Sequence, residues 1–182
     1  MNYKTFKRLY FQILLVFIAT SCTKPVDFEQ AKDFEITPVI ESSLIFFDEP
    51  ANQFLDNGSE IRVVQDFVLV SFFDDEFIVD NLIKAEFLFE VENSIHRNFE
   101  LQIDLFDDSN QLQHTFTVSA QASSEGDFIE TFEGTKLQAL KSTTAIVFTL
   151  RMLPGVPINQ DTLGNIQLQS SAVFYFKIGD TQ

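Results

Sequence analysis

The chain has 182 residues, and its 12 Lys and Arg against 27 Asp and Glu give a formal net charge of −15 at pH 7. Such acidity argues against binding to nucleic acid or to anionic lipid headgroups, because both need basic surface patches. The chain also has 22 Phe but no Trp and only 3 Tyr. Phe carries no polar group and belongs mainly in cores, so aromatic platforms for sugars or bases are scarce.

An export signal is predicted at the start of the chain. Lys4, Lys7 and Arg8 precede an apolar run over residues 9–19 that only Gln12 interrupts, which is the pattern of a secretory signal. The run is shorter than the ~20 apolar residues that a membrane-spanning helix needs. We therefore predict a signal peptide over residues 1–21. Its removal leaves 9 cations against 27 acids, a net charge of −18.

Ala19, Thr20 and Ser21 lead into Cys22, the only cysteine in the chain. This stretch resembles the bacterial lipobox, with Ser21 before the cleaved bond and Cys22 after it, although Ala19 stands where Leu is usual. The resemblance implies acyl chains of the palmitate type on Cys22. Since two or more chains anchor a protein stably, we expect membrane attachment through Cys22. The alternative is an ordinary secreted protein with a stray thiol.

The residue after Cys22 indicates in which bacterial membrane the protein would be anchored. In lipoproteins of enterobacteria an Asp in the next position favours the inner membrane; Thr23 here favours the outer membrane, with the periplasmic and outward faces both open. Residues 22–33 are polar and contain Pro25, so we predict a lipidated N-terminus and tether there, with a reach of at most ~35 Å. The remaining residues, 34–182, form the predicted domain.

From residue 34 onward, apolar and polar residues alternate, as they do in half-buried β-strands. The clearest strands cover residues 85–91, 99–105 and 112–118. Five further strands are predicted over residues 36–47, 61–73, 128–132, 145–152 and 166–178, and one short helix over residues 136–141. The first two of these five are long enough to bend or to switch sheets.

This pattern predicts an all-β fold, a two-sheet antiparallel β-sandwich, with a closed β-barrel as the alternative. The run 85–118 resembles the successive hairpins of immunoglobulin-like or fibronectin type III-like modules. The chain as a whole resembles small lipoproteins of Bacteroidota. An Ig-like sandwich is therefore the expected type.

The longest connection, residues 154–164, is a candidate functional loop or a plain connector. Within it, Asp161-Thr162-Leu163 resembles the short O-glycosylation pattern of Bacteroidota, in which Thr162 would carry the glycan. For metals, Asp74 to Glu76 and the Asp104 to Asp108 region offer oxygen ligands, but neither has calcium-loop spacing. We predict no metal site and no cofactor.

Catalytic residues are also not expected. The mature chain has only His96 and His114, and it lacks both the GxSxG nucleophile motif and a Gly-rich phosphate loop. We predict that His114 is a partly buried, hydrogen-bonded residue on its strand.

The sequence thus favours a non-enzymatic, membrane-anchored module that contacts a protein partner at the cell envelope. A small-ligand or glycan-binding lipoprotein is the alternative, and a hydrolase is a third. A pocket of converging polar groups would favour the second, and a pair of His114 with a carboxylate inside a cleft would favour the third.

Overall fold

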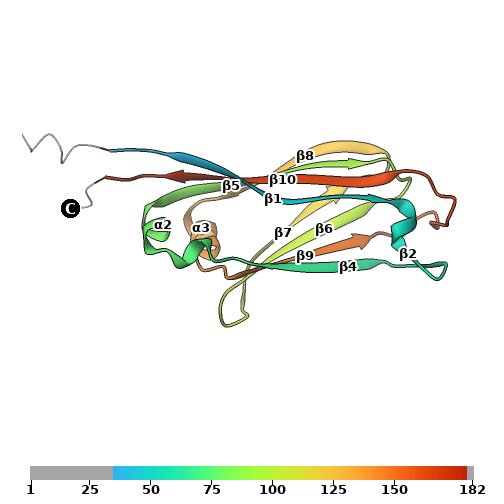
Figure 1. Ribbon diagram of the computed structural model, residues 1–182, viewed down its shortest axis with the longest axis horizontal. Coiled ribbons are helices and arrows are strands. Elements are labelled where there is room, and N and C mark those ends of the chain that lie inside the picture. Colours follow the sequence, from blue (N-terminus) through green and yellow to red (C-terminus); the bar gives the residue numbers. More distant parts are fainter. Residues whose placement is uncertain (1–34, 180–182) are drawn as a thin grey trace, which may run out of the picture. The chain divides into compact units, whose positions relative to one another are not determined.

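The computed structural model describes residues 35–179, in which two four-stranded antiparallel sheets carry most of the chain and β2 and β3 form a small third sheet (Figure 1). Sheet 1 has the order β1-β10-β5-β8 and sheet 2 the order β4-β9-β6-β7. Sheet 1 consists of β1 (Val39–Pro50), β10 (Asn165–Phe176), β5 (Leu82–Asn93) and β8 (Ser124–Phe132). Sheet 2 consists of β4 (Val63–Leu69), β9 (Ala145–Met152), β6 (Phe99–Phe106) and β7 (Leu112–Ala120).

The predicted two-sheet antiparallel sandwich is confirmed, but its strand order is not the immunoglobulin-like one. In the described part, the first long strand pairs with the last (β1 with β10), the second with the seventh (β4 with β9), the third with the sixth and the fourth with the fifth. This nested pairing is the topology of a jelly roll, whereas an immunoglobulin-like sandwich joins more of its neighbouring strands in hairpins. Alternation along a strand shows which face is buried, but it does not identify the partner strand.

The core between the sheets consists of the apolar faces that the alternation predicted. In β5, Ala85, Phe87 and Phe89 are at most 2% exposed. Aromatic rings cross from sheet to sheet, since Phe89 of sheet 1 lies 5.8 Å from Phe116 of sheet 2, centroid to centroid. Edge-to-face ring pairs of this kind add stability beyond the buried area. The many Phe residues therefore serve mainly the core.

Short elements connect the long strands. A turn at Asn57 and Gly58 joins β2 (Leu55–Asp56) to β3 (Ser59–Glu60), and both turn residues have positive φ, as a type I′ hairpin requires. The predicted short helix is α3 (Gly134–Lys141). The strands β2 and β3 were not predicted, nor were three short helical elements, namely η2 (Ala51–Phe54), η3 (Phe72–Asp74) and α2 (Glu76–Asn81). None of the helices within residues 35–179 has the length and apolar character needed to cross a membrane.

Candidate functional site

One side of the sandwich, where β7 and β8 are the edge strands, is closed by a polar cluster. His114 Nε2 on β7 lies 2.8 Å from Glu130 Oε1 on β8, and Lys136 Nζ on α3 lies 2.7 Å from the same oxygen. The His114 ring also meets Phe132 edge to face, with centroids 5.5 Å apart. The prediction of a partly buried, hydrogen-bonded His114 is confirmed. The pairing of His114 with a carboxylate, which a hydrolase would need, is present. However, this pair joins the two sheets and lines none of the hollows described below.

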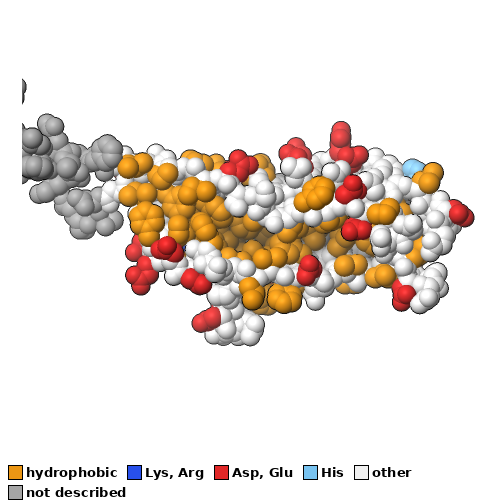
Figure 2. Space-filling view, viewed as in Figure 1, with side chains coloured by type: hydrophobic (Ala, Val, Ile, Leu, Met, Phe, Trp, Pro, Cys, Tyr) orange, Lys and Arg blue, Asp and Glu red, His pale blue; other side chains and the backbone are white. Residues whose placement is uncertain are grey.

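The opposite side, where β1 and β4 are the edge strands, is open. Figure 2 shows a hollowed band of hydrophobic side chains between these two strands, with acidic but no Lys or Arg side chains in view on this face of the described residues. All seven residues of β4 are exposed, and so are most of those of β1. The large apolar residues exposed here by 44–75% are Val39, Ile40, Phe46, Val63, Val64, Phe67, Val68 and Leu69. Contiguous exposed apolar surface of this kind marks interaction sites.

A β-bulge in β1 shapes this open side. Leu44 and Ile45 together face the single residue Ser170 of β10, because the register shifts between Ser43 and Phe46. The Ser170 hydroxyl accepts a hydrogen bond from the Ile45 N–H and donates one to the Ile45 carbonyl, both at 3.0 Å. It thereby satisfies the backbone groups that the bulge removes from the ladder.

The bulge also reverses which residues of β1 point inward. Before it, Ile40 shares the inner face with Phe174; after it, Phe47 lies opposite Leu168, and both are on the inner face. The odd-numbered Phe47 and Glu49 therefore reach the space between the sheets. Without the extra residue, they would face outward.

The two edge strands bound a cleft of about 430 Å³, a volume in the range of ligand pockets. Its floor is apolar and comes from both sheets. The lining residues are Ile45, Phe46, Phe47, Glu49, Gln53, Phe54, Val64, Asp66, Val68, Leu101, Phe148 and Leu150. We call this the β1/β4 cleft.

Two carboxylates, Asp66 of β4 and Glu49 of β1, line this apolar cleft. Within residues 35–179, neither has a cationic group within 4 Å. Asp66 Oδ1 instead accepts the backbone N–H of Phe67 at 2.8 Å. A charge pointing inward from an edge strand is a common device against edge-to-edge aggregation. The cleft therefore combines an apolar floor with uncompensated negative charge.

Sequence reasoning did not identify Asp66 as a site residue. The signal was the sequence VVQDFVL of β4, in which apolar residues fall on both faces of the strand and alternation is lost. Such a pattern occurs in strands buried on both sides, but here the strand is an edge and both faces are exposed. Predicting one long strand over residues 61–73 therefore did not reveal that this segment is an exposed edge.

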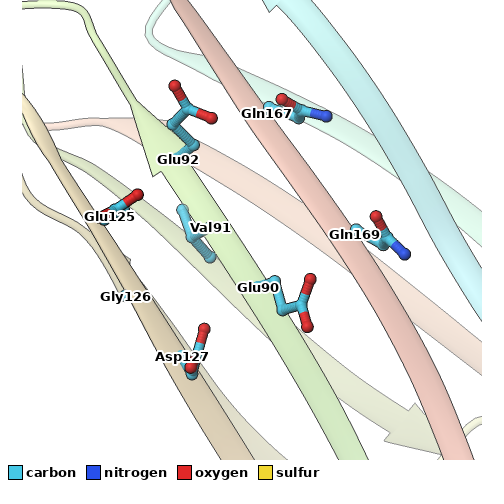
Figure 3. Close-up of a pocket in the computed structure, with 8 residues that line it drawn as sticks. All are labelled: Glu90, Val91, Glu92, Glu125, Gly126, Asp127, Gln167 and Gln169. Carbon is cyan, nitrogen blue, oxygen red and sulfur yellow. The ribbon is translucent and has the colours of Figure 1, made fainter.

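A second, polar hollow of about 360 Å³ lies on the outer face of sheet 1 (Figure 3). Its lining residues are Glu90, Val91, Glu92, Glu125, Gly126, Asp127, Gln167 and Gln169, from β5, β8 and β10. Among the described residues, no three His, Cys, Asp or Glu side chains are placed to hold a metal ion. The acidic segments considered for calcium have structural contacts, since Asp75 caps α2 through the Phe77 N–H and Asp107 accepts two N–H groups of its own turn.

The 154–164 connection is held to the domain by a buried ion pair. Arg97 is 3% exposed; it donates to the carbonyls of Leu153 and Val156 and lies 3.2 Å from Glu60. Glu60 also accepts the Ile158 N–H at 2.9 Å. This backbone hydrogen bond, opposed by partial burial and aided by Arg97, lowers the pKa of Glu60. The connection is therefore a fixed part of the domain near its anchor points.

The other residues predicted as sites are Thr162, Ser21 and Cys22. The Thr162 hydroxyl bonds within its own turn, accepting the Asn159 N–H at 2.9 Å; its glycosylation stays a prediction. Ser21, Cys22 and the boundaries of the signal peptide and tether lie outside the described residues.

No family model and no curated protein matches this sequence. Solved structures with a similar arrangement include a protein of Parabacteroides distasonis that is inferred to be secreted, with a TM-score of 0.47 and 14% identity over 62% of this chain and 37% of that chain. A chain of infectious bursal disease virus, Gx strain, has a TM-score of 0.41 and 11% identity over 79% of this chain and 32% of that chain. A carbohydrate-binding module, CBM4, has a TM-score of 0.36 and 10% identity over 71% and 86% of the two chains. This chain thus spans well under half of the first two, and the likeness is one of fold alone.

Proposed function

We propose that this chain is an exported lipoprotein, anchored to the outer membrane through acyl chains on Cys22, whose domain binds a protein partner with its open β1/β4 side. The observation that carries the proposal is the β1/β4 cleft, an apolar hollow bounded by two exposed edge strands. Edge strands offer backbone hydrogen bonds to a partner, and neighbouring apolar surface adds affinity and selectivity. The signal, the lipobox and Cys22 support the location.

The proposed activity is binding without catalysis. The titratable partner of His114 in the described structure is Glu130, and the same oxygen, Glu130 Oε1, also pairs with Lys136. A general base must reach a proton on a bound substrate, and this cluster lies at the junction of β7, β8 and α3 instead of in a hollow. Its arrangement supports a role in closing the sandwich.

Site-specific photo-crosslinking in membranes of the cells that make the protein tests the proposal. A crosslinker in place of Phe46, at the cleft, is compared with one in place of Ile129, which is 56% exposed on β8. We expect a specific adduct from the cleft position and none from the control position. We also expect the adduct to be lost in Cys22→Ala, which cannot be anchored. Equal adducts from both positions, or none from either, would contradict the proposal. Mass spectrometry of the mature N-terminus must also show acylated Cys22.

A second candidate function is the binding of a polar ligand such as a glycan. The hollow of Figure 3 favours it, because carboxylates and the amides of Gln167 and Gln169 line one stretch of sheet 1. Such groups can bond to hydroxyls, but no aromatic residue in the lining offers a platform for a sugar ring. A glycan array compares the wild type with Gln167→Ala; retention of a glycan by the wild type and its loss in the variant would favour this function.

A further inference from the structure

The unpaired edge of β4 presents a defined set of backbone groups. The Met152 N–H donates to the Arg62 carbonyl and the Val70 N–H to the Thr144 carbonyl, at 2.9 and 2.8 Å. Between these bonds, β4 pairs with β9 without a register shift. Since alternate residues of an antiparallel pair exchange hydrogen bonds, the even-numbered residues of β4 bond to β9. Val63, Gln65, Phe67 and Leu69 therefore direct their N–H and C=O groups away from the sheet, where no described strand pairs with them.

The side chains that face the cleft from β4 follow the order apolar, acidic, apolar, in Val64, Asp66 and Val68. A strand added beside β4 would place its own alternate side chains next to these three and over the apolar floor. Val64 and Val68 favour apolar neighbours, whereas Asp66 favours a cation. A matching segment therefore carries an apolar, a basic and an apolar residue at alternate positions.

Asp66 also indicates how the edge changes when a strand is added. Its Oδ1 now accepts the Phe67 N–H, which is one of the groups directed away from the sheet. A carbonyl of the added strand would take over that N–H and release the carboxylate to pair with a basic side chain. The same hydrogen bond lets Asp66 block the edge in the absence of a partner.

A second copy of this chain fits the edge poorly. Two β4 strands related by a two-fold axis would bring two Asp66 carboxylates into one cleft and would join two mature chains, each with a net charge of −18. Like charges opposite one another destabilise strand pairing. Charge complementarity therefore selects a basic partner segment and argues against self-association.

We infer that the partner contributes an extended segment with alternating apolar and basic residues, which adds as a strand to the β4 edge and fills the β1/β4 cleft. This inference rests on the proposed function and names the chemistry of the partner. The contact is a β-augmentation, in which the backbone gives affinity and the cleft gives selectivity.

Peptides of the same length as the seven-residue strand β4, with side chains complementary to it, test this inference. The mature lipidated protein in detergent is passed over immobilised Thr-Val-Thr-Lys-Thr-Val-Thr, over the same peptide with Glu in place of Lys, and over a scrambled peptide without alternation. We expect the Lys peptide to bind about tenfold more tightly than the Glu peptide, since the exchange turns an attraction into a repulsion. Asp66→Lys should reverse that preference.

Variants of Gln65 separate strand addition from general attraction of a basic peptide to an acidic protein. Gln65→Pro removes an N–H that points away from the sheet and leaves the bonds to β9 in place, so it should abolish binding. Gln65→Ala loses only the side-chain bond to Thr149 and should bind like the wild type. Binding of the Lys peptide to Gln65→Pro at wild-type strength, no preference between Lys and Glu, or no binding at all would overturn the inference. So would a dimer of the protein that Gln65→Pro dissociates.

The crosslinking experiment keeps the two claims distinguishable. An adduct at Phe46 that persists in Gln65→Pro would support docking at the open side and would contradict the addition of a strand to β4. Absence of any adduct at Phe46 would remove the proposed function itself.

Discussion

The two sides of the sandwich differ in how the edge strands of the two sheets meet. At β7 and β8, the sheets are joined by the His114–Glu130–Lys136 cluster and by aromatic rings such as Phe132, so that each polar group has a partner. At β1 and β4, exposed apolar residues surround a cleft in which Asp66 and Glu49 have no cation nearby in the described structure. The closed side therefore contributes to the stability of the domain, whereas the open side is the surface that we propose for binding.

Burial at the two sides predicts the largest difference between matched variants. Phe132, at the closed side, is fully buried, whereas Phe67, at the open side, is 63% exposed. Phe132→Ala should lower the free energy of unfolding by about 3–5 kcal/mol because it leaves a cavity. Phe67→Ala should change it by less than about 0.5 kcal/mol. Urea unfolding measures both, and similar losses would show that the β4 edge is packed rather than open.

Loss of the hydrogen bonds at the bulge in β1 should have an intermediate effect on the free energy of unfolding. Ser170→Ala leaves the Ile45 N–H and carbonyl without their partner in a 4% exposed position, so unfolding should become easier by about 1–3 kcal/mol. The control is Ser171→Ala, whose side chain faces the outer side of sheet 1 and should matter by less than about 0.5 kcal/mol. Equal effects in urea unfolding would mean that the hydroxyl does not hold the bulge.

Glu60 predicts a pH dependence at the end of the sandwich where the 154–164 connection is held. Its pKa is lowered in the folded state, chiefly by the Ile158 N–H and then by Arg97, so the ionised form stabilises the fold above the unfolded pKa. That stability is lost as the pH falls through the folded pKa. Glu60→Gln should be less stable than the wild type near neutral pH, with a difference that shrinks below about pH 4. A difference that is constant with pH in urea unfolding would contradict this origin.

The smallest effect on stability is expected at the open side itself. Asp66→Val removes a charge from an exposed edge and should change the free energy of unfolding by less than about 0.5 kcal/mol. It should nevertheless promote self-association, because the edge loses its blocking charge. Light scattering during size-exclusion chromatography measures this. Glu41→Val, on the outer face of β1, is the control, and if it associates as strongly, general loss of charge is the cause.

Particular strands show how far sequence reasoning could go. The strand over 145–152 was predicted with the bounds that the structure has, and the buried faces of β5 and β6 were assigned correctly. In β5 and β6, apolar residues gather on one face and mostly polar residues on the other, which leaves a period of two in the sequence. The segment 61–73 was predicted as a single strand, but β4 ends at Leu69 and η3 and α2 follow. An edge strand with apolar residues on both faces leaves no such period.

The candidate site depended on contacts between distant residues. Glu49 and Asp66 line one cleft, yet the first owes its inward direction to a bulge opposite Ser170. Arg97 likewise reaches Glu60 and the 154–164 connection across the fold. Nothing local in the sequence marks these residues as neighbours.

The sequence by itself determined the all-β class and the buried faces of the regular strands, because period-two alternation is a local pattern. The export signal and the roles of Ser21 and Cys22 also rest on local patterns, and they stay predictions. Only the tertiary structure decided the jelly-roll pairing, the closed and open sides and the cleft with its two carboxylates. Strand partners are chosen by long-range packing of whole faces, and an edge exists only in relation to the strands that pair with it.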